Sequence, residues 1–98
     1  MRLTRRLVIH GRVQGVFYRG WSEQQARSLG IAGWVRNRRD GTVEAVFSGP
    51  SEIVKGMIEA CRKGPWGARV DGVDEQASSS DELSQRRSGE EFSVLPTI

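Results

Sequence analysis

The stretch from Gly11 to Arg19 combines residue types that can bind a small anion, and it lies between the apolar run Leu7–Ile9 and a helix-start signal. Glycines such as Gly15 permit sharp turns, so consecutive backbone N–H groups can point into one concavity. A helix N-terminus adds further unpaired N–H groups and the positive end of its dipole. Arg19 adds a permanently charged planar fork that matches two phosphate oxygens. The stretch therefore predicts an anion cradle, with phosphate as the favoured anion.

A second stretch, Gly33-Trp34-Val35-Arg36-Asn37 followed by Asp40-Gly41, lies further along the chain. In order and spacing, these two stretches resemble the two signatures of the acylphosphatases, small enzymes that hydrolyse carboxyl-phosphate mixed anhydrides. The resemblance extends from about Leu7 to Val70 and fades in the C-terminal quarter. Nine positions with fixed glycines and an arginine are far more specific than a lone glycine-rich loop.

The resemblance implies hydrolysis of small acyl phosphates with Arg19 and Asn37 as the catalytic residues. We expect the phosphate to be held by the Arg19 guanidinium and by a backbone loop made of Gln14, Gly15, Val16, Phe17, Tyr18 and Arg19. The resemblance assigns Asn37 to the attacking water, and an amide suits that role because it can both donate and accept a hydrogen bond. From residue type alone, an ordinary strand end before a turn explains Asn37 better than a catalytic role, and only the resemblance favours the catalytic role.

The 98 residues suffice for one domain with a single core, so residues 1–98 are interpreted as one acylphosphatase-like domain. Residues 1–40 hold nine Lys or Arg and two Asp or Glu, whereas residues 41–98 hold six and ten. A positive half that contains the loop would steer anionic substrates towards it. Arginines other than Arg19 are explained as well by ordinary solvated surface.

The titratable and apolar residues exclude several classes of site. Cys61 is the only cysteine, so no internal disulfide can form. One histidine and one cysteine far apart show no zinc spacing, and Asp40 and Glu44 form no evident magnesium cluster. No apolar run approaches the roughly 20 residues of a membrane span, and the run Leu7–Ile9 is too short for a signal peptide. We expect a cytoplasmic protein with no metal, no cofactor and no membrane partner.

Hydrophobic periodicity predicts four main strands and two helices, with a short strand at the end of the chain. The first half of the chain is predicted to form a strand from Leu3 to Val13, a helix from Ser22 to Leu29, and strands from Ile31 to Asn37 and from Thr42 to Phe47. The second half is predicted to form a helix between Gly49-Pro50-Ser51 and Gly64-Pro65, a strand from Arg69 to Asp74, and a strand from Phe92 to Leu95. This order predicts an α+β ferredoxin-like βαββαβ sandwich, an antiparallel sheet with two helices on one face.

Local signals within this order are specific enough to test. Ser22 and Gln25 form a capping-box pattern at the start of the first helix. Gly30 suits the left-handed end of that helix, and Gly72 indicates a bulge in the fourth strand. The polar, serine-rich segment 76–91 is predicted to be a mobile connection.

Three alternative functions stay open: a nucleic-acid-binding module that uses its basic half on phosphates, an anion-binding regulatory domain without turnover, and a fragment of a larger protein. The strand aromatics Trp34, Phe47 and Phe92 lack the pattern of a base-stacking module. We therefore expect a small acyl phosphate as substrate, phosphate or sulfate as occupants of the site, no nucleic acid, and a monomer. No residues indicate a pocket for the acyl group.

Overall fold

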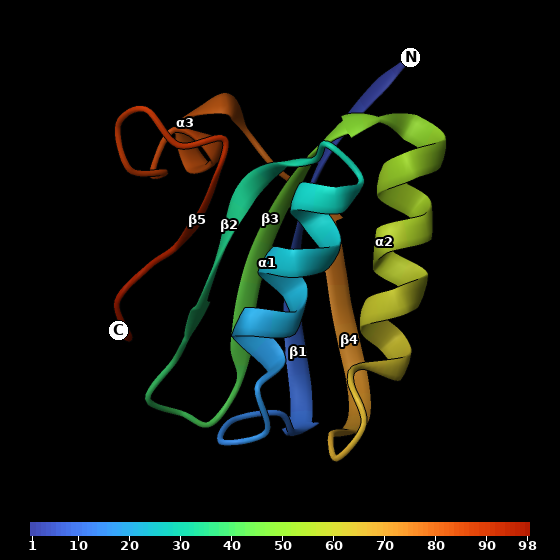
Figure 1. Ribbon diagram of the computed structural model, residues 1–98, viewed down its shortest axis with the longest axis vertical. Coiled ribbons are helices and arrows are strands. Elements are labelled where there is room, and N and C mark those ends of the chain that lie inside the picture. The colour runs from blue at the N-terminus through green and yellow to red at the C-terminus, as the bar shows by residue number, and fades with distance from the viewer.

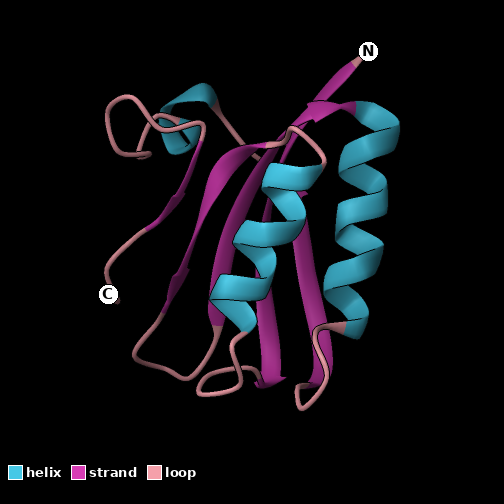
Figure 2. Cartoon of the chain, in the orientation of Figure 1, coloured by secondary structure: helices cyan, strands magenta, loops and turns pink.

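Five strands form one sheet, and two helices cover one of its faces (Figure 1, Figure 2). The computed structural model describes residues 1–98. The elements are β1 (Arg2–Arg12), α1 (Tyr18–Ser28), β2 (Ala32–Asn37), β3 (Val43–Pro50), α2 (Ser51–Lys63), β4 (Arg69–Ala77), α3 (Ser80–Leu83) and β5 (Phe92–Val94). The strands lie in the order β4-β1-β3-β2-β5. This arrangement confirms the predicted ferredoxin-like α+β sandwich.

The main core lies between the sheet and the two long helices. Alternation along β1 places Leu7 and Ile9 on this side, and both side chains are fully buried. Helix α2 contributes a stripe of residues at helical spacing: Val54, Met57, Ile58 and Cys61. Burial of each large aliphatic side chain contributes about 1.5–3 kcal/mol, so this layer holds the helices firmly against the sheet.

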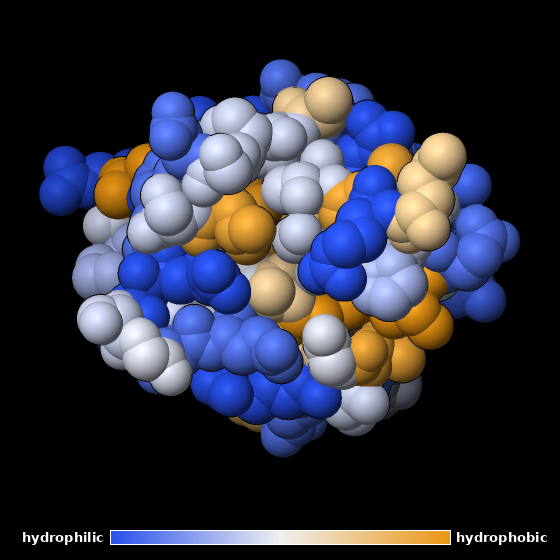
Figure 3. Space-filling model, turned by 90° about the horizontal axis from the view of Figure 1, so that it is seen from above, coloured by the Kyte–Doolittle hydropathy of each residue, from blue (hydrophilic) through white to orange (hydrophobic).

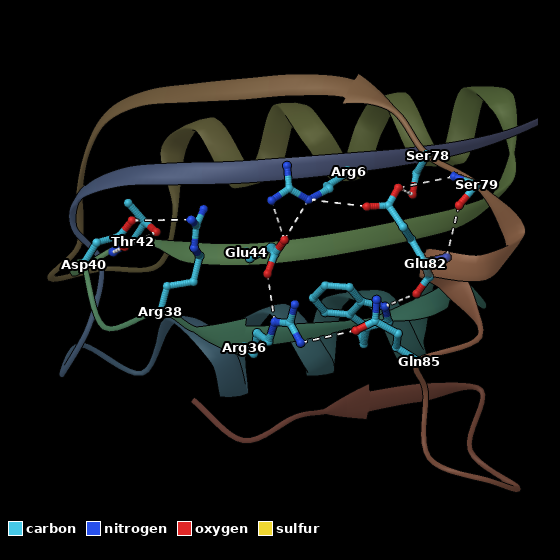
Figure 4. A network of polar contacts seen from close by, with 11 residues as sticks. Arg6, Arg36, Arg38, Asp40, Thr42, Glu44, Ser78, Ser79, Glu82 and Gln85 are labelled. Carbon is cyan, nitrogen blue, oxygen red and sulfur yellow. Dashed lines mark hydrogen bonds and ion pairs between the residues drawn. The ribbon is translucent and has the colours of Figure 1, made fainter. Parts of the chain in front are cut away.

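A polar network around the buried Glu44 lies on the opposite face of the sheet (Figure 4). Glu44, only 4% exposed, accepts hydrogen bonds from Arg6 Nε at 2.7 Å and from Arg36 Nε at 2.8 Å. The Trp34 indole donates to the carbonyl of Glu82 at 2.7 Å, and the Arg36 guanidinium lies 4.5 Å from the Trp34 ring centre. Burial alone would raise the pKa of Glu44, but the hydrogen bonds and charges of the two arginines lower it below its ordinary value. The buried carboxylate is therefore ionised and paired.

Helix α1 begins at Tyr18, earlier than the sequence pattern indicated. Ser22 is buried within the helix, and its hydroxyl donates to the carbonyl of Tyr18 at 2.8 Å. The predicted capping box of Ser22 and Gln25 is therefore wrong, because a serine inside a helix can bond to the carbonyl four residues back. The residue that precedes the helix is Phe17, whose φ of 64° is left-handed.

The C-terminal third differs most from the expectation. Strand β4 continues to Ala77, and a capping box of Ser79 and Glu82 opens the short helix α3. The chain then crosses from one edge of the sheet to the other, where β5 pairs with β2 in the parallel direction (Figure 1). The sheet is therefore mixed and not wholly antiparallel as predicted. The mobility of residues 76–91 stays a prediction.

The predicted glycine signals are confirmed in three places. Gly30 follows α1 with a φ of 69°, and Gly64 ends α2 with a φ of 72°. The register between β1 and β4 shifts where His10 faces Gly72 and Gly11 faces Val70, which is the bulge predicted near Gly72. Local turn chemistry was thus readable from residue type alone.

The two ends of the molecule differ in character. Figure 3 shows the end where α1 finishes and α2 begins, and there hydrophobic areas lie among hydrophilic side chains. At the other end lie the loop of residues 13–17, the hairpin between β2 and β3, and the loop of residues 64–68 (Figure 1). None of the helices has the length and apolar character needed to cross a membrane. The loop predicted to bind an anion therefore lies at the same end as the hairpin that follows Asn37.

Candidate active site

A cavity of about 440 Å³ lies where the β1–α1 loop meets the end of β2. Ten residues line it: Val13, Gln14, Gly15, Phe17, Tyr18, Arg19, Gly20, Glu23, Asn37 and Val94. Every predicted site residue lines this cavity except Val16, whose side chain packs against the main core. The tertiary structure therefore brings the two sequence stretches together.

The loop between β1 and α1 has the backbone form of an anion nest. Gly15 and Phe17 both have left-handed φ values, 74° and 64°. None of the backbone N–H groups from Gln14 to Phe17 donates a hydrogen bond to an acceptor of the chain. Alternating backbone conformations of this kind make concave donor sites for anions, and the adjacent helix N-terminus adds unpaired donors. The loop therefore has the donors that a phosphoryl group needs.

Arg19 lies in the first turn of α1 and lines the cavity. Its guanidinium makes no ion pair and no hydrogen bond within the chain, whereas the nearby Glu23 pairs with Arg27 at 3.2 Å. A positive charge at a helix N-terminus is opposed by the helix dipole, so this placement is unfavourable unless an anion binds beside it. The local charge therefore favours an anionic ligand.

Asn37 is the last residue of β2 and lines the same cavity. Its side-chain oxygen Oδ1 is buried and has no hydrogen-bond partner. Leaving a buried acceptor unsatisfied typically costs about 1–3 kcal/mol, which marks this oxygen as a group awaiting a donor. Its backbone carbonyl is occupied, because it accepts from the N–H of Ile98 at 3.2 Å.

The side chain of Gln14 ties the loop to the β2–β3 hairpin. Its amide nitrogen donates to the carbonyl of Arg38 at 2.7 Å and to the carbonyl of Thr42 at 2.9 Å. These bonds hold the loop beside the strand end that carries Asn37. The sequence pattern placed Gln14 in the loop but did not indicate these two partners, because they lie across the fold.

The hairpin is itself braced at its turn. Asp40 Oδ1 accepts from the Thr42 hydroxyl at 2.6 Å and from the Thr42 N–H at 3.0 Å. These two hydrogen bonds, with a further contribution from the charge of Arg38, lower the pKa of Asp40 below its ordinary value. The turn next to Asn37 is therefore closed by an ionised aspartate.

Tyr18, Cys61 and His10 are poorly suited to nucleophilic or basic roles in this cavity. The Tyr18 hydroxyl donates to the carbonyl of Cys61 at 2.7 Å, and burial raises the pKa of Tyr18 well above its usual value. Burial likewise raises the pKa of the Cys61 thiol to about 12. His10 does not line the cavity, and its Nε2 lies 2.9 Å from Asp74 Oδ2.

The sequence patterns did not indicate some of the residues that line the cavity. Val94 reaches the cavity because β5 pairs with β2, with Val94 opposite Val35. Gly20 directly follows Arg19, and Glu23 lies four residues beyond Arg19 on the same face of α1. Helical spacing from Arg19 could have indicated Glu23, but no local signal links Val94 to the loop.

The fold and the cavity define a small ferredoxin-like α+β domain with an anion-nest loop and an unpaired arginine at one end. A sequence model of the acylphosphatase family matches residues 5–93. The acylphosphatase of Rhodopseudomonas palustris is 55% identical over 96 residues, which cover 98% of this chain and 97% of the relative. That of Bradyrhizobium diazoefficiens is 55% identical over 92 residues, covering 94% and 93%.

A solved structure agrees with these relatives. The crystal structure of the acylphosphatase from Bacillus subtilis matches with a TM-score of 0.81 at 31% identity, covering 97% of this chain and 99% of that chain. The chain therefore belongs to the acylphosphatase family, and it is an enzyme of that family.

Proposed function

We propose that the protein hydrolyses the carboxyl-phosphate bond of small acyl phosphates to a carboxylate and inorganic phosphate, without a metal ion. The observation that carries the proposal is the meeting, in one cavity, of unpaired loop N–H groups, an unpaired arginine and a buried unpaired amide oxygen. Membership of the acylphosphatase family supports the same reaction.

The loop of residues 14–19 binds the phosphoryl group. Its N–H groups and the Arg19 guanidinium meet the negative charge on the phosphoryl oxygens with donors that are already oriented. Such preorganised donors are effective because they need no rearrangement as charge develops, and the loss of one typically lowers the rate about 100- to 1,000-fold. Free phosphate or sulfate binds the same donors.

Asn37 positions the water for attack in line with the bond that breaks. Its Oδ1 accepts a hydrogen bond from the water, which satisfies the oxygen left unpaired within the chain. The water oxygen forms a bond to phosphorus, and the bond from phosphorus to the acyl oxygen breaks with its electron pair leaving on the carboxylate. The water proton passes to a phosphate oxygen or to solvent, since an amide is too weak a base to take it.

The reaction needs little help at the leaving group, because a carboxylate already leaves readily. No group of three or more His, Cys, Asp or Glu side chains is placed to hold a metal ion. We therefore expect full activity in the presence of EDTA, and a pH–rate profile without a limb assignable to His10.

The test is hydrolysis of benzoyl phosphate in the presence of EDTA, followed by ultraviolet absorbance. We expect the wild type to turn over, and Arg19→Ala and Asn37→Ala each to lose at least about 100-fold in kcat/KM. Arg12→Ala is the matched control, because Arg12 is exposed, makes no ion pair and does not line the cavity. Circular dichroism and urea unfolding establish that each variant is folded.

Asn37→Ala also separates a catalytic role from a structural one. The substitution removes a buried unpaired oxygen, so the urea midpoint should not fall while kcat does. A folded but inactive wild type, or activity lost on adding EDTA, would contradict the proposal. Salt-sensitive RNA binding by such an inactive protein would favour a nucleic-acid-binding module instead.

A further inference from the structure

We propose that the exposed ring of Phe17 forms one wall of a subsite for the acyl group, and that the enzyme consequently prefers aromatic and larger apolar acyl phosphates to acetyl phosphate. This inference rests on the proposed hydrolysis of acyl phosphates. It adds a specificity-determining residue whose side chain is distinct from the phosphate donors, which in this loop are backbone N–H groups.

The backbone conformation of the loop does not explain why residue 17 is a phenylalanine. The anion nest requires a left-handed backbone there, with φ of 64°, and Phe17 is the only residue other than glycine with a positive φ. Glycine or asparagine adopts this conformation with less strain. A bulky aromatic residue at such a position is an outlier, and outliers of this kind concentrate at functional sites.

Packing in the hydrophobic core does not explain the aromatic ring at this position either. Phe17 is 64% exposed, whereas its neighbour Tyr18 is fully buried in the main cluster. The ring of Phe17 lies over Gly20, where an added β-carbon would be only 2.3 Å from ring atom Cε1. Both residues line the cavity. The absent side chain at Gly20 thus leaves room for the ring beside the phosphate donors.

The cavity has space beyond the phosphate. At about 440 Å³ it falls within the range of sites for whole small molecules, and a phosphoryl group fills only part of it. Val94 from β5 supplies a further apolar lining residue, partly buried against the main core. A cavity with anion donors and apolar walls matches an acyl phosphate, which is charged at one end and apolar at the other.

The test compares kcat/KM for benzoyl phosphate with kcat/KM for acetyl phosphate. Phe17→Gly removes the ring and retains the left-handed backbone, because glycine adopts positive φ freely. We expect the benzoyl-to-acetyl ratio to fall by about tenfold, the factor typical of losing one aromatic contact. Phe17→Leu, which keeps an apolar wall, should hold the ratio within about threefold of the wild type.

Gly20→Ala tests the same wall without touching residue 17. The added methyl group must displace the Phe17 ring, because the contact would otherwise be 2.3 Å. The ratio should fall again, while alanine within α1 favours the helix. Trp66→Ala is the control: Trp66 is 99% exposed and does not line the cavity, so the ratio should stay unchanged.

Phenylphosphonate and methylphosphonate provide a readout that needs no turnover. The wild type should bind phenylphosphonate more tightly, and Phe17→Gly should lose that preference even if its turnover is impaired. Suppose that the wild type hydrolyses both substrates, but that Phe17→Gly changes neither the benzoyl-to-acetyl ratio of kcat/KM nor the ratio of the two phosphonate affinities by more than twofold. The role of Phe17 as an acyl wall is then overturned, and the proposed function stands. A folded wild type that hydrolyses neither substrate overturns both.

Discussion

Arg19 and Asn37 share the property that their polar side-chain groups lack partners within the chain. Arg19 makes no ion pair at a helix start where its charge is unfavourable, and the Asn37 oxygen is buried without a donor. Isolated polar atoms of this kind lower stability, so a fold retains them where a ligand supplies the missing contact. At the scale of single residues, the cavity thus holds an unpaired guanidinium and an unpaired amide oxygen, which is what the proposed binding of a substrate and a water requires.

Substitution of Arg19 by lysine tests whether the planar fork matters beyond the charge. We expect Arg19→Lys to lower kcat/KM for benzoyl phosphate by about 100-fold, because an ammonium group retains the charge but not the two parallel hydrogen bonds. Phosphate should also inhibit this variant less strongly. Steady-state kinetics on Arg19→Lys beside Arg12→Lys would check this, and near-wild-type activity of the former would reject the bidentate role.

At the scale of elements, the cavity depends on contacts between segments that are distant along the chain. Gln14 connects the loop to the β2–β3 hairpin, and β5 connects the C-terminal segment to β2. The Leu95 N–H donates to the Val35 carbonyl at 2.9 Å, which continues this connection towards Asn37. The loop and the strand end are therefore held in place by neighbours on both sides.

Removal of the Gln14 amide should loosen the loop. Gln14→Met keeps a similar volume but removes two hydrogen bonds, so we expect the free energy of unfolding to fall by about 1–2 kcal/mol. We also expect kcat/KM to fall by about tenfold, because the loop donors lose their fixed position relative to Asn37. Urea unfolding and steady-state kinetics measure the two effects. Unchanged kinetics in a destabilised variant would show that the two Gln14 hydrogen bonds stabilise the fold but do not contribute to catalysis.

The network on the opposite face predicts a pH dependence of stability. Glu44 has a lowered pKa in the folded state, so its stabilisation is fully present above the unfolded pKa and is lost as pH falls through the folded value. Glu44→Gln should therefore lower the free energy of unfolding by about 3 kcal/mol at pH near 7 and by much less at pH near 3. Urea unfolding at the two pH values measures the difference.

Glu59→Gln is the control for this prediction. Glu59 is exposed on α2 and pairs only with Arg62 at 3.5 Å, so its removal should have a small effect at either pH. A Glu44→Gln effect that is equally large in acid would mean that packing, and not the ionised carboxylate, explains the stabilisation.

At the scale of the whole molecule, the part of the sequence that contributes most of the cavity is rich in positive charge. The first 40 residues carry nine Lys or Arg and two Asp or Glu, and they include the loop, Arg19 and Asn37. Arg38 and Arg39 lie on the hairpin directly after Asn37, and Arg38 contacts Asp40 at 3.6 Å. A positive potential around the mouth of a cavity raises the encounter rate of small anions.

Salt should therefore lower kcat/KM, which includes the encounter with substrate, more than it lowers kcat. We expect kcat/KM for acetyl phosphate to fall several-fold as ionic strength rises from about 10 mM to about 200 mM, because the screening length shortens below the size of the charged surface. The value of kcat should change little. Kinetics in a chloride series, extended to Arg39→Gln, would test this, and a salt-independent kcat/KM would remove the steering role.

Much of the fold and of the site was predictable because it depends on short-range patterns. Alternation in β1, the helical stripe of α2 and the glycines that end the helices all act within a few residues of their own position. The two family signatures indicated Arg19 and Asn37 through their neighbours in sequence. The error at Ser22 is of the same local kind, because a capping pattern cannot tell a helix start from a helix interior when the preceding loop already turns the chain.

By itself, then, the sequence determined the order of the strands and of the two long helices, the family, and the two side chains expected to act on substrate. Only the tertiary structure decided that β5 runs parallel to β2, that Val94 reaches the cavity and that Gln14 bonds across to the hairpin. It also decided that the Phe17 ring stays exposed over Gly20. The physical reason is that these contacts join residues whose separation is set by the packing of the whole sheet, and no local propensity encodes such pairings.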